Sequence, residues 1–118
     1  MKNLLIIDDE ERIRKIIRIQ LHNTEFSVYE AENRDLAFKI LESVPVDVII
    51  CDIKMKESNG FVILKELKEK YPHIPVIMLT GFIDKKVSDK AKEMGCFDFI
   101  TKPVRREKLK ETISNALH

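Results

Sequence analysis

Five short strand-like runs alternate along the chain with segments in which apolar residues recur at helical spacing. The runs cover residues 4–7, 28–31, 46–51, 76–79 and 97–100, and the first, third and fourth are almost continuously apolar. Unbroken apolar runs of this length are typical of parallel strands that are covered on both faces. The pattern therefore predicts five strands, three of them deeply buried.

Each segment that follows a strand-like run carries one apolar stripe, which predicts an amphipathic helix. The fourth helix, over about residues 85–94, has the thinnest stripe, and the fifth covers about residues 105–117. Strict alternation of strand and helix with short connections implies right-handed crossovers. We therefore predict an α/β fold, a flavodoxin-like (βα)5 doubly wound parallel sheet with strand order 2-1-3-4-5. The stripes consist of Ile13, Ile16, Ile17 and Leu21; Leu36, Ala37, Ile40, Leu41 and Val44; Phe61, Leu64, Leu67 and Tyr71; Val87, Ala91 and Met94; and Leu109, Ile113 and Leu117.

Length and charge place the chain as one globular domain over residues 1–118. The 21 Lys and Arg nearly balance the 20 Asp and Glu, so no overall field that attracts DNA or a membrane is expected. No apolar run approaches the roughly 20 residues that span a bilayer, and no signal peptide fits the first run. Cys51 and Cys96 show no metal-ligand spacing. We expect a cytoplasmic protein without contact to membranes.

Polar residues whose side chains can bind ligands or react follow four of the strand-like runs. Asp8 and Asp9 follow the first, Asp52 the third, Thr80 the fourth and Lys102 the fifth. The carboxyl ends of parallel strands share one edge of a sheet, and the switch point of this strand order lies between the first and third strands. We therefore expect these side chains to form a single acidic pocket.

Three converging carboxylates repel one another unless a cation compensates them. Mg²⁺ prefers oxygen ligands and typically uses one or two carboxylates together with a phosphoryl oxygen. A lysine and a hydroxyl nearby stabilise a phosphoryl group in transfer, and one carboxylate then acts as the nucleophile. Asp52 is the natural nucleophile because it stands alone beside the pair Asp8 and Asp9.

Taken singly, each of these residues also has an ordinary structural role. Asp8 or Asp9 can cap the following helix, and we weigh this equally with a functional role for either one alone. Asp52 and Thr80 are common turn residues, and Lys102 can be a solvated loop residue. It is improbable that all five residues have only these structural roles at the same edge of the sheet. We therefore favour a shared functional pocket.

Four short motifs carry a family resemblance: Ile7-Asp8-Asp9-Glu10, then Asp52-x-x-Met55 with Asn59-Gly60, then Leu79-Thr80-Gly81, and finally Phe99-Ile100-Thr101-Lys102-Pro103. In this order and at these separations the chain resembles the receiver (CheY-like) domain of two-component response regulators over essentially its whole length. The resemblance implies that Asp52 accepts a phosphoryl group from a phosphohistidine on a sensor histidine kinase or a histidine phosphotransfer protein. It also implies a domain that promotes its own phosphorylation and dephosphorylation but is not a turnover enzyme.

The same resemblance implies roles for the other pocket residues. Asp9, Asp52 and the backbone carbonyl of Lys54 would bind Mg²⁺, with Mn²⁺ as an alternative ion, and Asp8 would bind through water. Thr80 would hydrogen-bond the phosphoryl group and Lys102 would pair with it. The Lys102–Pro103 peptide bond would be cis, an isomer that rarely occurs outside X-Pro bonds.

The implied output is a change of surface. Phe99 matches an aromatic switch position that works with Thr80 to alter the face made by the fourth helix, fifth strand and fifth helix. This face would control an output domain or effector protein, or a phosphorylation-dependent dimer. The sequence departs from the family pattern at Lys56, where a proline commonly follows the methionine.

Three competing functions fit the sequence less well. A Mg²⁺-dependent phosphatase acting through an aspartyl-phosphate would need an acid two residues after the nucleophile, where Lys54 stands. A flavodoxin-like binding module would need a phosphate-cradling first loop, which Asp8 and the acidic residues after it exclude. A degenerate receiver is disfavoured because every pocket position is filled. Direct nucleic-acid binding is not expected either, because the basic residues around Lys102 lack interleaved aromatics.

Overall fold

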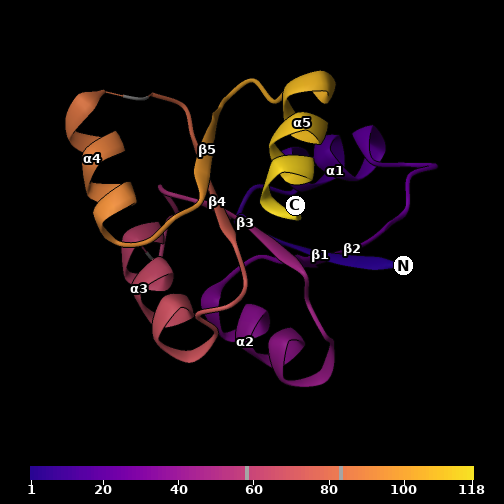
Figure 1. The fold of residues 1–118 in the computed structure, drawn as a ribbon, viewed down its shortest axis with the longest axis horizontal. Coiled ribbons are helices and arrows are strands. Elements are labelled where there is room, and N and C mark those ends of the chain that lie inside the picture. Colours follow the sequence, from indigo (N-terminus) through magenta and orange to yellow (C-terminus); the bar gives the residue numbers. More distant parts are fainter. Residues whose placement is uncertain (58, 83) are drawn as a thin grey trace.

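The computed structural model describes residues 1–57, 59–82 and 84–118 and contains five strands that alternate with five helices (Figure 1). The strands all pair in parallel in the order β2-β1-β3-β4-β5, which confirms the predicted fold. In chain order the elements are β1 (Lys2–Ile7), α1 (Glu11–Gln20), β2 (Phe26–Ala31), α2 (Arg34–Ser43), β3 (Val48–Asp52), α3 (Gly60–Lys70), β4 (Val76–Thr80), α4 (Lys85–Glu93), β5 (Asp98–Thr101) and α5 (Arg106–Ala116).

Two hydrophobic clusters hold the three layers together, one on each face of the sheet. Helices α2, α3 and α4 cover one face, and α1 and α5 cover the other. Every residue of β3 and β4 is buried, including Asp52 and Thr80 at their ends. This burial agrees with the continuous apolar runs in the sequence, because a strand covered on both faces has no solvent-facing side.

Helix α4 is the least anchored of the five helices. Ala91 is its one buried residue, while Val87 and Met94 pack partly against the α2–α3–α4 cluster. The thin apolar stripe predicted for this segment is therefore a thin contact with the sheet. Few buried apolar contacts are characteristic of elements that move at low energetic cost.

The buried face of α2 differs from the predicted one. Leu36 was placed on the apolar stripe, but it is 39% exposed, whereas Phe38 is buried. The ring of Phe38 packs against Tyr71 at the end of α3, with ring centroids 6.3 Å apart, and the Arg34 guanidinium lies over its other side at 4.2 Å from the centroid. The aromatic ring therefore turns the helix so that Leu36 lies toward solvent.

The boundaries of all five strands differ by one or two residues from the predicted runs. Strand β2 begins at Phe26, two residues earlier than predicted, and β3 begins at Val48, two residues later. Strand β5 begins at Asp98, and Phe97 before it is 43% exposed. These shifts follow from pairing with neighbouring strands, since Lys2 on β1 already pairs with Phe26.

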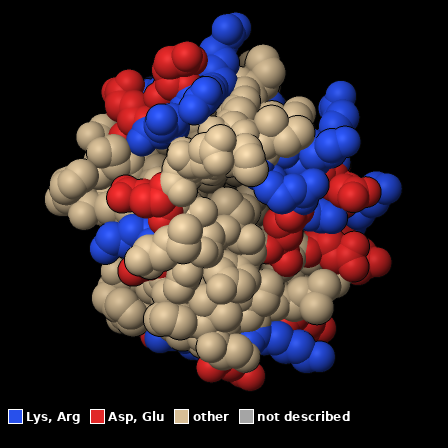
Figure 2. Space-filling view, turned by 90° about the vertical axis from the view of Figure 1, so that its right-hand side faces the viewer, with Lys and Arg blue, Asp and Glu red and all other residues tan. Residues whose placement is uncertain are grey.

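The surface mixes charges of both signs. Figure 2 shows the side of the molecule on which the N-terminus lies, where uncharged residues fill most of the centre and Lys, Arg, Asp and Glu occupy the periphery. No single sign of charge dominates this face, as the net charge of +1 leads one to expect.

No helix in the described part of the chain is long and apolar enough to cross a membrane.

Candidate functional site

The carboxyl ends of β1, β3, β4 and β5 bring the predicted pocket residues to one edge of the sheet. Asp8 follows β1, Asp52 and Thr80 end β3 and β4, and Lys102 follows β5. The Nζ atom of Lys102 lies 3.4 Å from Asp52 Oδ1 and 3.8 Å from Asp8 Oδ2. The backbone N–H of Lys102 donates to the Thr80 carbonyl at 2.7 Å, which fixes the loop that carries the ammonium. Two carboxylates and a cation therefore share a buried site.

Burial makes both central carboxylates reluctant to ionise. Burial raises the pKa of Asp8 from its usual 3.8 to about 6, a rise opposed by the Glu10 backbone N–H, which donates to Asp8 Oδ1 at 2.9 Å. Burial likewise raises the pKa of Asp52, although the nearby Lys102 ammonium acts in the opposite direction. Asp8 Oδ2 and Asp52 Oδ2 are buried and have no hydrogen-bond partner among the described residues. Because these carboxylates share the single Lys102 ammonium, their negative charge is not fully compensated and favours a second cation.

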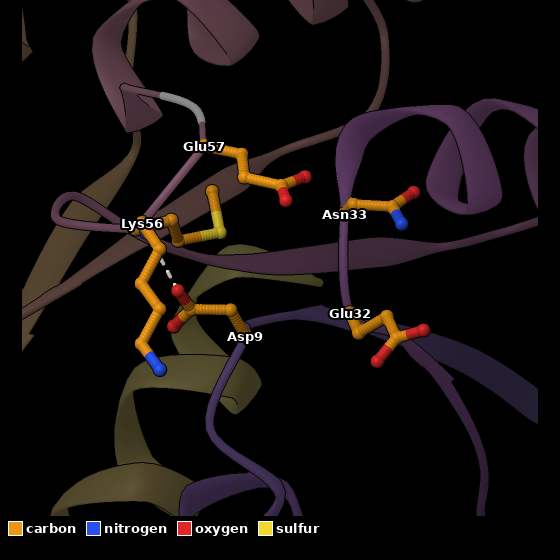
Figure 3. Close-up of a pocket in the computed structure, with 6 residues that line it drawn as sticks. Asp9, Glu32, Asn33, Lys56 and Glu57 are labelled. Atoms are coloured by element: carbon orange, nitrogen blue, oxygen red, sulfur yellow. Dashed lines mark hydrogen bonds between the residues drawn. The ribbon is translucent and has the colours of Figure 1, made fainter.

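Asp9 lies at the mouth of this site and is partly exposed. Its Oδ2 accepts a hydrogen bond of 2.6 Å from the backbone N–H of Lys56 (Figure 3). Asp8, Asp9 and Glu10 each present a carboxylate oxygen within 4.8 Å of the others, a spacing compatible with a shared metal ion. Oxygen donors alone make up this set, and hard cations such as Mg²⁺ prefer such donors.

The hydroxyl of Thr80 is occupied within its own loop. Its Oγ1 donates to the Phe82 carbonyl at 2.9 Å and accepts from the Phe82 N–H at 3.2 Å. Phe99 on β5 is half-buried against the α2–α3–α4 cluster, and the Lys92 ammonium of α4 lies 5.8 Å from the centre of its ring. Thr80 and Phe99 therefore lie on adjacent strands, Thr80 at the acidic site and Phe99 beside α4.

The family model described as "Response regulator receiver domain" matches residues 4–114. The chain belongs to the receiver domain family of response regulators. The structure of chemotaxis protein CheY4 from Vibrio cholerae superposes with a TM-score of 0.93 at 27% sequence identity, and the match covers 99% of each chain.

Curated relatives are longer proteins. A putative NtrX-like response regulator of Rickettsia felis is 38% identical over 109 residues, which cover 91% of this chain and 23% of that protein. The transcriptional regulatory protein GlrR of Escherichia coli is 34% identical over 117 residues, which cover 98% of this chain and 26% of that protein. The chain thus spans about a quarter of the length of these relatives.

Several receiver positions lie as expected from the sequence. Asp8, Asp52 and Lys102 come together directly, and the Lys102–Pro103 peptide bond is cis. Lys54 is exposed in the loop after β3, where it forms an isolated antiparallel β-bridge with Asn59. Neither aspartate of the pair acts as a helix cap by its side chain, because the N-cap of α1 is Glu10 and has no side-chain capping bond.

The sequence did not reveal three contributions to this receiver site. The Glu10 carboxylate lies 3.7 Å from Lys102 Nζ, and Arg14 donates to the Asp8 carbonyl at 2.7 Å while its other side pairs with Glu30 of β2. The third is the backbone N–H of Lys56, which donates a hydrogen bond to the Asp9 carboxylate. Of the three, only Glu10 had a signal in the sequence, because it continues the acidic run after Asp8 and Asp9. A backbone donor has no signal in the sequence, and the contacts of Arg14 depend on how α1 packs beside β2.

The raised pKa of Asp8 predicts that the metal-free domain is destabilised by its own site at neutral pH. A carboxyl with a pKa near 3.8 in the unfolded chain and about 6 in the fold binds its proton more tightly when folded. The protonated Asp8 carboxyl therefore contributes to the stability of the fold. This contribution is complete below pH 3.8 and is lost as the pH rises through about 6. Asp8→Asn should therefore raise the free energy of unfolding at pH 7.5 by up to about 3 kcal/mol.

Urea unfolding in the presence of a chelator measures this difference. The gain from Asp8→Asn should shrink steadily when the pH is lowered from 7.5 to 4.5, and Mg²⁺ should stabilise wild-type protein more than the variant. Asp35→Asn, at an exposed position on α2, is the matched control and should change stability little. A pH-independent gain for Asp8→Asn would contradict the prediction.

Proposed function

We propose that this receiver accepts a phosphoryl group on Asp52 from a phosphohistidine of a sensor histidine kinase or a histidine phosphotransfer protein. The observation that carries the proposal is the Asp52 carboxylate, which is buried at the switch point of the sheet. One of its oxygens lies 3.4 Å from Lys102 Nζ, and the other has no hydrogen-bond partner among the described residues. A buried carboxylate with a free oxygen beside a fixed cation is arranged to attack an incoming phosphorus atom.

In the proposed transfer, an Asp52 oxygen forms the new O–P bond while the N–P bond of the phosphohistidine breaks. The electron pair of that bond remains on the imidazole, which takes up a proton. Lys102 stands close enough to compensate the charge on the phosphoryl oxygens, because it already lies among three carboxylates. Positioning and compensation of charge account for most of the acceleration in phosphoryl transfer.

Asp9, Asp52 and the Lys54 carbonyl would hold Mg²⁺ or Mn²⁺, and Asp8 would contact the ion through water. Two observations support this assignment: Asp52 Oδ2 is buried without a hydrogen-bond partner among the described residues, and carboxylate oxygens of Asp8, Asp9 and Glu10 gather beside it. When bound, the ion would neutralise carboxylate repulsion and the charge of the phosphoryl oxygens. Receiver domains as a family use an acidic pocket of this kind for a divalent cation.

The proposed switch starts from Thr80. Its hydroxyl must leave the Phe82 backbone before it can hydrogen-bond a phosphoryl group on Asp52. That movement would open space beside Phe99, and α4 would follow because few buried contacts hold it. A phosphoryl group shifts the population only as far as it interacts more favourably with the rearranged loop. The altered α4–β5–α5 face would control an output domain, an effector protein or a phosphorylation-dependent dimer.

The similarity to longer transcriptional regulatory proteins supports an output domain elsewhere in a longer protein. We propose that this domain itself does not bind nucleic acid or membranes, acts in the cytoplasm, and serves as a switch rather than as a turnover enzyme. The near-neutral net charge, and the lack of one dominant sign on the face in Figure 2, support the absence of nucleic-acid and membrane binding.

Incubation with Mg²⁺ and acetyl phosphate tests the acceptor role without any partner. Intact-mass spectrometry should show a gain of one phosphoryl group, and hydroxylamine should remove it because acyl phosphates are labile to this nucleophile. A chelator should suppress the gain, and added Mg²⁺ should restore it. Uptake of equal extent in the presence of the chelator would contradict the role of the cation.

A further inference from the structure

The carboxylate of Asp9 is tied to the loop after β3 by a single backbone hydrogen bond. The Lys56 N–H donates to Asp9 Oδ2 at 2.6 Å, across 47 residues of sequence. No other hydrogen bond holds the Asp9 side chain among the residues that the structure describes. The two residues line a hollow of about 260 Å³ together with Glu32, Asn33, Met55 and Glu57. Figure 3 shows the hydrogen bond between them.

This bond connects two parts of the candidate cation site. Asp9 belongs to the loop after β1, whereas Lys56 lies two residues beyond Lys54 and four beyond Asp52. A partly exposed carboxylate without a partner would rotate about its side-chain torsions. The N–H holds Oδ2 and leaves Oδ1 free to bind an ion. Asp8 is held in the same way, because the Glu10 N–H engages one of its oxygens and leaves the other without a hydrogen-bond partner among the described residues.

Carboxylates that ligate metals are themselves usually hydrogen-bonded, and loss of such an outer bond lowers metal affinity. We propose that the backbone N–H of Lys56 is a positioning donor of this kind. It orients Asp9 for a divalent cation and keeps the ligand-bearing loop after β3 against it. The proposal rests on the assignment of Asp9 as an ion ligand in the proposed function. Any residue except proline can supply this main-chain donor. Since proline is the residue common at this position in the family pattern, the donor is a feature of this chain and not of the family.

Two variants separate the N–H from the side chain. Lys56→Ala keeps the backbone donor and removes the exposed ammonium, whereas Lys56→Pro removes both. Calorimetric titration of the metal-free proteins with Mg²⁺ should give Lys56→Ala an affinity at least equal to that of wild type, because a nearby positive charge is lost. Lys56→Pro should bind about 10-fold or more weakly than Lys56→Ala.

The possible outcomes distinguish the inference from the proposed function on which it rests. Equal affinities of the proline and alanine variants would overturn the positioning role. Tighter binding by Lys56→Pro would also overturn it, since the donor would then compete with the ion for Asp9. Failure of wild-type protein to bind Mg²⁺ at all would refute the cation site itself.

A measurement on unaltered protein keeps the inference testable if the proline variant does not fold. In NMR spectra of the wild type, the Lys56 amide should exchange slowly with solvent for an exposed loop residue. This protection should persist when Mg²⁺ saturates the protein. Loss of protection on Mg²⁺ binding would show that the ion displaces the donor, and the positioning role would then be wrong.

Discussion

The Asp52→Asn variant should take up no phosphoryl group from acetyl phosphate under conditions in which the wild type gains one. An amide is uncharged at neutral pH and is a poor nucleophile, so the O–P bond cannot form at this position. The remaining carboxylates do not replace it, because in the proposed function Asp9 is a direct ligand of the cation and Asp8 contacts the cation through water. We therefore expect the yield to fall to background.

Loss of uptake in this variant should not come from unfolding. Burial raises the pKa of Asp52, so replacing its carboxylate with a neutral amide removes an unfavourable buried charge. Lys102 keeps two acidic neighbours, Asp8 at 3.8 Å and Glu10 at 3.7 Å. We expect metal-free Asp52→Asn to be at least as stable as the wild type in urea at pH 7.5. Asp35→Asn is the matched control and should be phosphorylated normally; unchanged uptake by Asp52→Asn would refute the assignment of the acceptor.

Gly60→Ala should destabilise the domain by about 3 kcal/mol or more, because there is no space for a side chain at the start of α3. An added Cβ would lie 2.2 Å from the Asp52 carbonyl oxygen and 2.6 Å from the Ile53 Cα. Both atoms belong to the backbone and cannot rotate away. The Gly60 N–H also donates to the Ile53 carbonyl at 2.8 Å. Moving α3 away to relieve the clash would therefore break this hydrogen bond.

Gly81→Ala is the matched control for this substitution. Apart from its chain neighbours, no atom of the described residues lies within 4 Å of the Cβ that it would add, and its φ is not positive. Its stability should remain within about 0.5 kcal/mol of the wild type. Urea unfolding followed by far-ultraviolet circular dichroism suits both variants, since the chain has no tryptophan. A loss below about 1 kcal/mol in Gly60→Ala would show that the end of β3 yields more easily than the packing indicates.

The close packing at Gly60 also bears on phosphorylation. Because the clash would fall on the carbonyl of Asp52 itself, any relaxation must move the residue that carries the proposed nucleophile. Gly60→Ala protein that remains folded should therefore be phosphorylated more slowly than Gly81→Ala protein. The Asn59 side chain caps α3 by accepting from the Phe61 N–H at 2.8 Å, which sets the helix start beside Asp52.

The pattern of apolar residues predicted the elements and their order correctly because burial on both faces of a sheet leaves a direct mark on the sequence. Strands β3 and β4 are buried at every residue, so their runs are uninterrupted. The orientation of α2 was not predictable in the same way. Leu36 and Phe38 are both apolar, and the choice between them came from the Tyr71 ring on another helix.

The sequence alone determined the fold, the edge of the sheet that carries the site, and the meeting of Asp8, Asp52 and Lys102. These follow from periodicity and strand order, which bring the ends of distant strands together whatever the details of packing. Only the tertiary structure decided the donors that hold the acidic pair, the Thr80 hydroxyl bond to Phe82, and the contact between Gly60 and Asp52. Most of these contacts involve backbone atoms, which every residue type possesses, so the residue letters could not encode which groups would meet.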